Sequence, residues 1–356
     1  PFGSFPPLGD DSCKATHGIV HPCEVFRSTR CCKDVATVRK NEYVNLPVIC
    51  LVGPTASGKS GLAVRVCRRL YVDEHPAEII NTDSMVVYRG MDIGTATPTL
   101  REQRTVVHHL VSILDVTVPS SLVLMQTLAR DAVEDCLSRG VIPVLVGGSA
   151  LYTKAIIDEM SIPPTDPEVR ARWQEKLDAE GPRVLHDELA RRDPKAAESI
   201  LPGNGRRIVR ALEVIDLTGS FTATIPDGTL HWPKTVQMGL ELSRKDIDQR
   251  IADRVDQMWA YGFVDEVRSL ANVGLREGLT ASRALGYRQV LEYLNGDYDE
   301  DEARRRTIIG TRRFARKQLM WYRRDDRIEW FNALAPDLDD RVVARVLTAL
   351  TTDEED

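Results

Sequence analysis

The chain of 356 residues lacks any apolar run near the roughly 18 residues that cross a membrane. It has no internal repeat at the periods of solenoid proteins, and no segment with the apolar centre of a signal peptide. Basic residues are not in excess, because 47 Lys and Arg face 53 Asp and Glu, for a formal net charge of −6. These absences disfavour a membrane protein, a repeat protein and, more weakly, a partner recognised by overall positive charge.

The seven cysteines form no recognisable metal or disulfide framework. Four of them lie within residues 1–46 at a C-x9-C-x7-C-C spacing that matches no zinc pattern: Cys13, Cys23, Cys31 and Cys32. The composition of residues 1–46 favours a flexible extension, with a regulatory or targeting role as the alternative. Cys50 and Cys67 lie beside a phosphate-binding motif, which favours a reducing, cytoplasmic setting.

That motif is the clearest positive feature of the sequence. It reads G-x-x-x-x-G-K-S and comprises Gly53, Pro54, Thr55, Ala56, Ser57, Gly58, Lys59 and Ser60. It follows the apolar run 48–52 and opens an amphipathic stretch, which is the strand–loop–helix context of a P-loop. Backbone N–H groups there bind phosphates, Lys59 adds a charge and the Ser60 hydroxyl is placed to ligate Mg²⁺. The motif alone leaves open whether the phosphates belong to ATP, GTP or another ligand.

The surrounding pattern predicts an α/β fold with a P-loop NTPase-like, doubly wound parallel sheet and a helical insertion domain. Strands are expected at 47–52, 78–81, 141–146 and 236–240, with helices at about 58–71 and 122–138. Residues 163–230 break this rhythm with helical patterns at 167–180, 183–191 and 205–218. The predicted domains are the extension 1–46, the first part of the core 47–162, the helical insertion 163–230, the core return with basic helices 231–335, and a C-terminal helix with an acidic tail 336–356.

Two polar side chains follow predicted strands and so should reach the edge where ligands bind. Asp83 is a candidate Mg²⁺ ligand or general base, and a cap on the following turn is the alternative. Ser149 follows Gly147-Gly148, where backbone can approach a ligand closely. Its hydroxyl would donate to a leaving oxygen or a substrate base, although a simple helix N-cap would have the same sequence.

Basic residues are segregated along the chain. The stretch 304–324 contains nine Lys or Arg and no acid, interleaved with Phe314, Trp321 and Tyr322. A second cluster in the insertion comprises Arg206, Arg207 and Arg210. In an acidic protein this pattern is typical of contacts to a nucleic-acid backbone. The alternative is a helix with solvated arginines and core-facing aromatics.

Two further pairs are candidates for the site. Arg250 and Arg254 stand at i and i+4 on one face of a predicted helix, and either is in a position to reach a diphosphate. His108-His109 suggests a metal, but no Cys, Asp or Glu stands nearby at zinc spacing. We therefore interpret the two histidines as ordinary hydrogen-bonding or packing residues.

Together these blocks resemble the bacterial tRNA dimethylallyltransferase family, also called the tRNA isopentenyltransferase or IPP transferase family. The resemblance runs from about residue 47 to 331, and its motifs occur in the family's order: 53–60, 83–96, 108–110, 146–152, 166–170, 206–214, 283–289 and 310–313. It implies transfer of a dimethylallyl group from dimethylallyl diphosphate to N6 of the adenine 3′-adjacent to the anticodon, position 37 of the tRNA. The loop would then hold an isoprenoid diphosphate.

The resemblance also implies roles for residues. Asp83 matches the general base, and the catalytic set becomes Asp83, Lys59, Ser149, Arg250 and Arg254. The matched tRNA contacts are Asp83, Ser84, Met85, Val86, Ser149, Arg170, Arg206, Arg207, Arg210, Arg283, Gly286, Tyr287, Arg288, Gln289, Arg316, Lys317 and Gln318. The implied cofactor is Mg²⁺, and the implied partners are dimethylallyl diphosphate and a tRNA anticodon stem-loop bound by a monomer.

The sequence departs from the family pattern at three positions. Val86 replaces a usual Gln, Thr97 a common Lys and Val107 a usual Pro. The eukaryotic form is disfavoured because no C-terminal Cys₂His₂ module appears. The competing hypotheses are an adenylate isopentenyltransferase acting on free AMP, ADP or ATP, a P-loop nucleotide kinase, and an RNA-binding P-loop module without catalysis.

Overall fold

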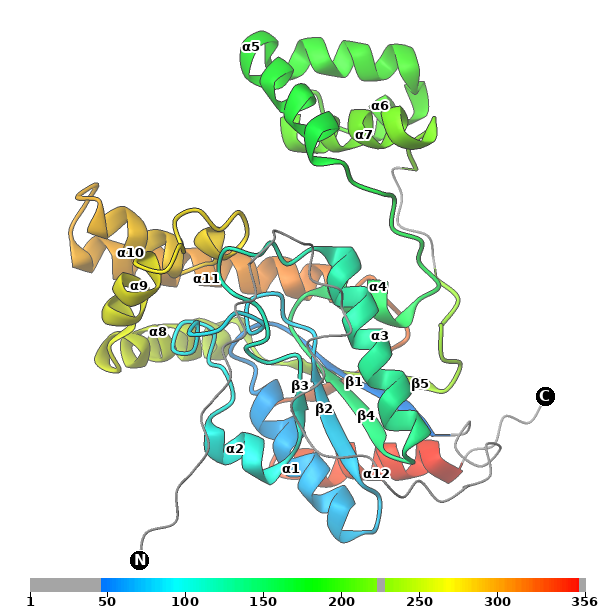
Figure 1. Cartoon of the computed structure of the whole chain (residues 1–356). Coiled ribbons are helices and arrows are strands. Elements are labelled where there is room, and N and C mark those ends of the chain that lie inside the picture. Colours follow the sequence, from blue (N-terminus) through cyan, green and yellow to red (C-terminus); the bar gives the residue numbers. More distant parts are fainter. Residues whose placement is uncertain (1–45, 223–227, 352–356) are drawn as a thin grey trace, which may run out of the picture. The chain divides into compact units, whose positions relative to one another are not determined.

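The computed structural model describes residues 46–222 and 228–351, which belong to a single compact unit of the chain. A six-stranded, wholly parallel sheet lies at its centre, with the strand order β3-β2-β4-β1-β5-β6 (Figure 1). The strands are β1 Val48–Val52, β2 Ala77–Asn81, β3 His108–His109, β4 Ile142–Val146, β5 Thr235–Glu241 and β6 Ile328–Asn332. The predicted extension, apart from Leu46, and the acidic tail lie outside the described residues.

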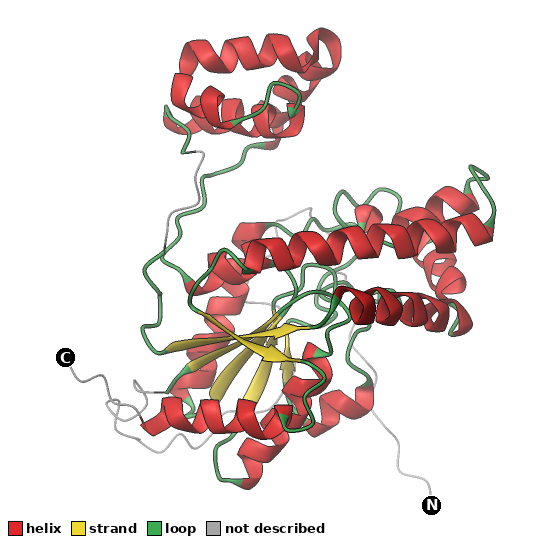
Figure 2. Cartoon of the chain, turned by 180° about the vertical axis from the view of Figure 1, so that it is seen from behind, coloured by secondary structure: helices red, strands yellow, loops and turns green. Residues whose placement is uncertain are grey.

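Both faces of the sheet are buried, as the apolar run 48–52 predicts. Alternate residues of β1 point to opposite cores: Val48, Cys50 and Val52 to one, Ile49 and Leu51 to the other. Helices α3 (Leu122–Ser138) and α4 (Ala150–Ile157) cover the first face, and α1 (Lys59–Val72) and α12 (Leu338–Thr351) cover the second (Figure 2). The predicted doubly wound α/β class is confirmed.

The second half of the chain adds helices near the C-terminal ends of the strands. They are α8 (Arg244–Ala260), α9 (Phe263–Ala271), the 3₁₀ turn η3 (Ala281–Arg283), α10 (Tyr287–Leu294) and α11 (Glu300–Tyr322). Helices α8 and α11 pack through Ile247, Ile251 and Ala315, and Ala56 of the P-loop joins this cluster. The phosphate-binding loop is therefore supported by residues about 190 to 260 positions away in sequence.

The insertion contains the helices α5 (Pro167–Arg192), α6 (Pro194–Ser199) and α7 (Gly205–Thr218). They share an apolar cluster of their own, which includes Trp173, Leu189 and Leu212. Helix α5 is interrupted at Gly181, where φ is 83°, in agreement with the predicted break between 180 and 183. Helix α6 was not predicted.

The sequence also failed to predict α2 (Leu100–Thr105) and β3 (His108–His109), which are too short to show a periodicity. Strand β3 exists because it pairs with β2, Ile79 opposite His108 and Ile80 opposite His109. Within residues 46–222 and 228–351, no helix combines the length and apolarity needed to cross a membrane.

Candidate active site

A cavity of about 1080 Å³ opens where the loops after β1, β2 and β4 meet helices α8 and α11. Because parallel strands end at one edge, residues distant in sequence converge there. The predicted site residues that line the cavity are Thr55, Ala56, Gly58, Lys59, Ser60, Asp83, Ser84, Met85, Val86, Ser149, Arg250, Arg254, Arg283, Tyr287 and Gln318.

The P-loop has the backbone shape that a phosphate cradle needs. Gly53 adopts φ +136°, and a Cβ there would come 2.7 Å from the Leu240 carbonyl oxygen, so glycine is required. The Lys59 ammonium donates to the Pro54 carbonyl at 2.7 Å and is only 8% exposed. Burial lowers the pKa of Lys59 to about 8, although the nearby Asp83 carboxylate opposes this shift.

Asp83 lies two residues beyond β2 and is oriented by its own turn. Its N–H donates to Asn81 Oδ1 at 2.9 Å, and its Oδ1 accepts from the Met85 N–H at 2.8 Å. The alternative predicted role, a cap on the turn, is thus part of what Asp83 does. Its other oxygen, Oδ2, has no hydrogen-bond partner in the described part of the chain and is available to the cavity.

Both candidate arginines reach the loop from α8. Arg250 Nη1 donates to the Ser57 carbonyl at 3.4 Å, and Arg254 Nη1 donates to Thr55 Oγ1 at 3.3 Å. Burial lowers the pKa of Arg254, and the charge of Asp83 partly offsets that effect. The two arginines therefore stand together beside the loop.

Ser149 occupies the N-cap position of α4, but its hydroxyl makes no capping hydrogen bond. The side chain is half-buried and lines the cavity instead. The hydroxyl therefore remains available for a ligand, as the catalytic prediction requires.

The donor set suits a hard cation. Ser60 begins the first turn of α1, is exposed and lines the cavity, and its hydroxyl has no partner among the residues that the structure describes. A hydroxyl and phosphate oxygens are ligands that Mg²⁺ accepts, so the predicted ligand Ser60 fits. Mg²⁺ remains a prediction.

Two of the expected tRNA contacts, Gln318 and Tyr287, are buried side chains in the wall of the cavity. Gln318 is 5% exposed, and its amide is bonded to two backbone groups: Oε1 accepts from the Thr55 N–H at 2.9 Å and Nε2 donates to the Gly148 carbonyl at 2.7 Å. Tyr287 is fully buried against Phe263 and donates to Glu266 Oε1 at 2.6 Å. Both side chains shape the cavity wall, and their contact with tRNA remains a prediction.

Other expected tRNA contacts lie outside the cavity lining: Gly286, Arg288, Gln289, Arg316 and Lys317 near α10 and α11, and Arg170, Arg206, Arg207 and Arg210 in the insertion. Gly286 is buried at the start of α10, where its N–H donates to Gln289 Oε1 at 2.8 Å. Arg170 and Arg210 form ion pairs with the fully buried Glu213, at 2.7 and 2.9 Å. Their contact with tRNA remains a prediction.

Most basic side chains in the stretch 304–324, in and just after α11, are already paired with acidic residues. Acidic partners engage six of its nine cations: Arg304, Arg305, Arg306, Arg312, Arg316 and Arg323. Arg324 lies over the Trp321 ring. Arg313 and Lys317, one turn apart, are exposed and have no acidic partner in 46–222 or 228–351. Of the aromatics, Tyr322 is buried, whereas Phe314 and Trp321 are 45% and 43% exposed.

One supporting residue gave no signal in the sequence. The Glu266 carboxylate on α9 accepts from the backbone N–H groups of Asp92 and Ile93, at 3.1 and 2.7 Å, and from the Tyr287 hydroxyl. It holds the start of the segment 92–97, which lines the cavity. A glutamate 173 or 174 residues away in sequence cannot be linked to these backbone groups by spacing.

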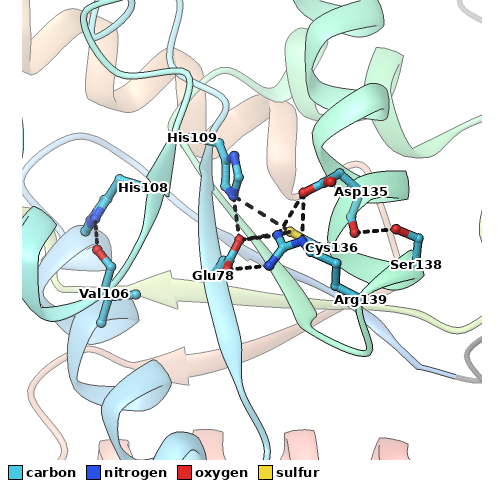
Figure 3. Close-up of polar contacts among 8 residues, drawn as sticks. All are labelled: Glu78, Val106, His108, His109, Asp135, Cys136, Ser138 and Arg139. Carbon is cyan, nitrogen blue, oxygen red and sulfur yellow. Dashed lines mark hydrogen bonds and ion pairs between the residues drawn. The ribbon is translucent and has the colours of Figure 1, made fainter. Parts of the chain in front are cut away.

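Both histidines make hydrogen-bond contacts in the fold. His108 Nδ1 lies 2.8 Å from the Val106 carbonyl oxygen, and His109 Nε2 lies 2.7 Å from Glu78 Oε2 (Figure 3). Folding also brings the Cys136 thiol within 4.8 Å of the ligand atoms of Glu78 and His109. Arg139 already binds both Glu78 oxygens, at 2.8 and 2.6 Å, so we assign the cluster as an ion-pair network.

Comparison with known proteins agrees with this site. The IPP transferase family matches residues 86–325. A tRNA dimethylallyltransferase of Thermobifida fusca is 54% identical over 300 residues, which cover 84% of this chain and 94% of the relative.

Two solved structures are also similar. The tRNA isopentenylpyrophosphate transferase of Bacillus halodurans is 36% identical with a TM-score of 0.62, over 85% of this chain and 96% of the other. The tRNA delta(2)-isopentenylpyrophosphate transferase of Staphylococcus epidermidis is 28% identical with a TM-score of 0.62, over 85% and 99%. The resemblance inferred from the sequence blocks is confirmed, and the chain belongs to the IPP transferase family of tRNA-modifying prenyltransferases.

Proposed function

We propose that this enzyme transfers a dimethylallyl group from dimethylallyl diphosphate to N6 of the adenine at position 37 of tRNA, with release of diphosphate. The observation that carries the proposal is the shared cavity: a diphosphate-type loop and a carboxylate with an open oxygen face the same space. A phosphate site alone would suit a nucleotide kinase. The carboxylate adds a base for an amine nucleophile.

The chemistry follows from this arrangement. The C1–O bond of the donor breaks, the N6–C1 bond forms, and the N6 proton passes to Asp83 Oδ2. Negative charge develops on the leaving diphosphate, where the loop N–H groups, Lys59 and the arginines of α8 stabilise it. Mg²⁺, bound through Ser60 and the diphosphate, would add positive charge to the same leaving group.

The acceptor must leave its base stack to reach this depth, which favours an unpaired anticodon loop as the substrate region. The exposed Phe314 lines the cavity, and Arg313 and Lys317 stand beside it on α11, which supports an approach of RNA from this side. We further propose that the enzyme acts as a monomer, because described residues of one chain line the cavity, and that it works in the cytoplasm, where the free thiols of Cys50 and Cys67 would stay reduced.

The test is incubation of purified protein with dimethylallyl diphosphate, Mg²⁺ and unmodified tRNA, followed by mass spectrometry of the digested RNA. We expect N6-dimethylallyladenosine at position 37. Parallel reactions with AMP and ATP identify the alternatives. Product on AMP without product on tRNA would establish an adenylate isopentenyltransferase, and phosphoryl transfer from ATP would establish a kinase.

A further inference from the structure

Gln318 lies at the junction of three elements. Its side chain leaves the buried face of α11 and reaches the loop after β1 and the loop after β4 at once. One turn later, the Tyr322 hydroxyl approaches the Gly147 carbonyl at 3.4 Å, so α11 contacts the second loop at two successive carbonyls. The contact with Thr55 joins α11 directly to the phosphate-binding loop.

The orientation of the Gln318 amide is determined by its partners. The Thr55 N–H can only donate, so it must face Oε1, and the Gly148 carbonyl can only accept, so it must face Nε2. A Cβ at position 148 would collide with Nε2, so Gly148 leaves the space that the amide occupies. A glutamate could not donate to Gly148, and a methionine would make neither hydrogen bond.

We propose that Gln318 is a positioning residue that holds the diphosphate loop in its binding shape by tying it to the loop after β4. The inference rests on the proposed function for the identity of the ligand. Thr55 transmits the effect, because its N–H is bound by Gln318 while its hydroxyl accepts from Arg254. The Gln318 amide thus fixes the backbone at one end of the phosphate-binding loop. Through Thr55 it also fixes the hydroxyl that accepts from Arg254, one of the arginines proposed to bind the diphosphate.

The test compares Gln318→Met with a matched control, Gln126→Met. The Gln126 amide also makes two backbone hydrogen bonds, to the carbonyls of Ala155 and Met160 at 2.6 and 2.9 Å, but it lies outside the cavity lining. Three quantities are measured: the Kd of inorganic pyrophosphate with Mg²⁺ by calorimetry, the KM for dimethylallyl diphosphate, and the Kd of tRNA by filter binding.

We expect Gln318→Met to raise the pyrophosphate Kd and the KM for dimethylallyl diphosphate by about tenfold, the equivalent of two lost hydrogen bonds. The tRNA Kd should stay within about twofold, and Gln126→Met should leave all three quantities near wild type. Gly148→Ala displaces the same amide without altering α11, so it should raise the pyrophosphate Kd in the same way. If Gln318→Met fails to fold, the pyrophosphate Kd of Gly148→Ala tests the proposal instead.

Two results would overturn the proposal. One is an unchanged pyrophosphate Kd in both Gln318→Met and Gly148→Ala. The other is a tRNA Kd that rises as much as the pyrophosphate Kd, which would make Gln318 an RNA contact. If wild-type protein binds pyrophosphate but does not prenylate tRNA, the proposed function fails, whereas the pyrophosphate Kd still decides the role of Gln318.

Discussion

Strand β2 has an acid toward each end, and the two acids have different surroundings. Glu78, near the start of the strand, is bound at both oxygens by Arg139 and also by His109 (Figure 3). Asp83, just past the end, gives one oxygen to its own turn and leaves the other open to the cavity. The carboxylate of Glu78 is therefore held in an ion-pair network, whereas the carboxylate of Asp83 keeps one oxygen available to a ligand.

The neighbouring cations differ in the same way. The Arg139 guanidinium is hydrogen-bonded to Glu78, and this bond raises the pKa of Arg139. Lys59 and Arg254 are near Asp83 but are not hydrogen-bonded to it, and burial lowers the pKa of both. A paired cation stabilises the fold, whereas cations held without a bonded carboxylate remain available to an anionic ligand. This difference distinguishes Glu78, which is bound in an ion-pair network, from Asp83, for which we propose a catalytic role.

The comparison predicts the largest effect for Asp83→Asn. The amide keeps the size of the side chain but cannot accept the N6 proton, so we expect kcat to fall about 10²- to 10⁴-fold. The Kd of tRNA should change little. Single-turnover assays and filter binding measure the two quantities, and Glu78→Gln is the matched control because it removes a carboxylate charge five residues earlier, within β2. Equal losses of kcat in the two variants would contradict the assignment.

Glu78→Gln should instead lower stability. Burial raises the pKa of Glu78, but the hydrogen bonds from Arg139 and His109 outweigh it and hold the value at about 2. We expect loss of these bonds to cost about 2 kcal/mol in the free energy of unfolding at pH 7, measured by urea denaturation. Glu329→Gln, which breaks the exposed pair with Arg345, should cost well under 1 kcal/mol.

The pH dependence of this stabilisation has a definite sign. The folded pKa of Glu78 is about 2 and the ordinary value is 4.5, so the ionised carboxylate stabilises the fold above pH 4.5. That contribution is lost as the pH falls from 4.5 towards 2. The difference in the free energy of unfolding between wild type and Glu78→Gln should therefore shrink as the pH falls over this interval. A difference that stays constant with pH would show that the ion pairs of Glu78 are not the source of the stabilisation.

The sequence pointed to Asp83 as a site residue but gave no indication of the network around Glu78. Asp83 could be found because a strand pattern and a P-loop are local signals, and parallel strands bring their ends together. The partners of Glu78 lie 31 to 61 residues away, in a two-residue strand and at the end of α3, and no spacing rule connects them. Residues predicted from local motifs therefore do line one cavity, whereas contacts that depend on packing between distant segments gave no signal in the sequence.

Gln318 shows a second limit. The buried face of α11 consists of Ala303, Thr307, Ala315, Gln318 and Tyr322, which are mostly small or polar. Burial on this helix does not follow hydrophobicity, so the sequence cannot show which face is inside. Hydrogen bonds from Gln318 and Tyr322 to the carbonyls of Gly148 and Gly147 add to the apolar contacts of Ala315 and Tyr322 on this face.

The cations beside Asp83 give a third test. With a pKa of about 8 in the free enzyme, Lys59 loses its charge as the pH rises through that value. We expect kcat/KM for dimethylallyl diphosphate to fall about tenfold between pH 7 and pH 9, because the uncharged amine no longer attracts the diphosphate. Lys59→Arg keeps its charge and should show a flat profile in this range. A flat wild-type profile to pH 9.5 would mean that Lys59 stays protonated without ligand.

The smallest effect concerns paired and unpaired cations on α11. Lys317 has no acidic partner in the described residues, whereas Arg305 is paired with Glu302 at 2.6 Å. We expect Lys317→Gln to raise the Kd of tRNA severalfold and to lower the slope of log Kd against log salt by about one, the mark of one lost phosphate contact. Arg305→Gln removes the same charge from the same helix, but its guanidinium is already engaged, so the slope should not change. Equal slopes for the two variants would mean that tRNA responds to the overall charge of α11 and does not contact Lys317 itself.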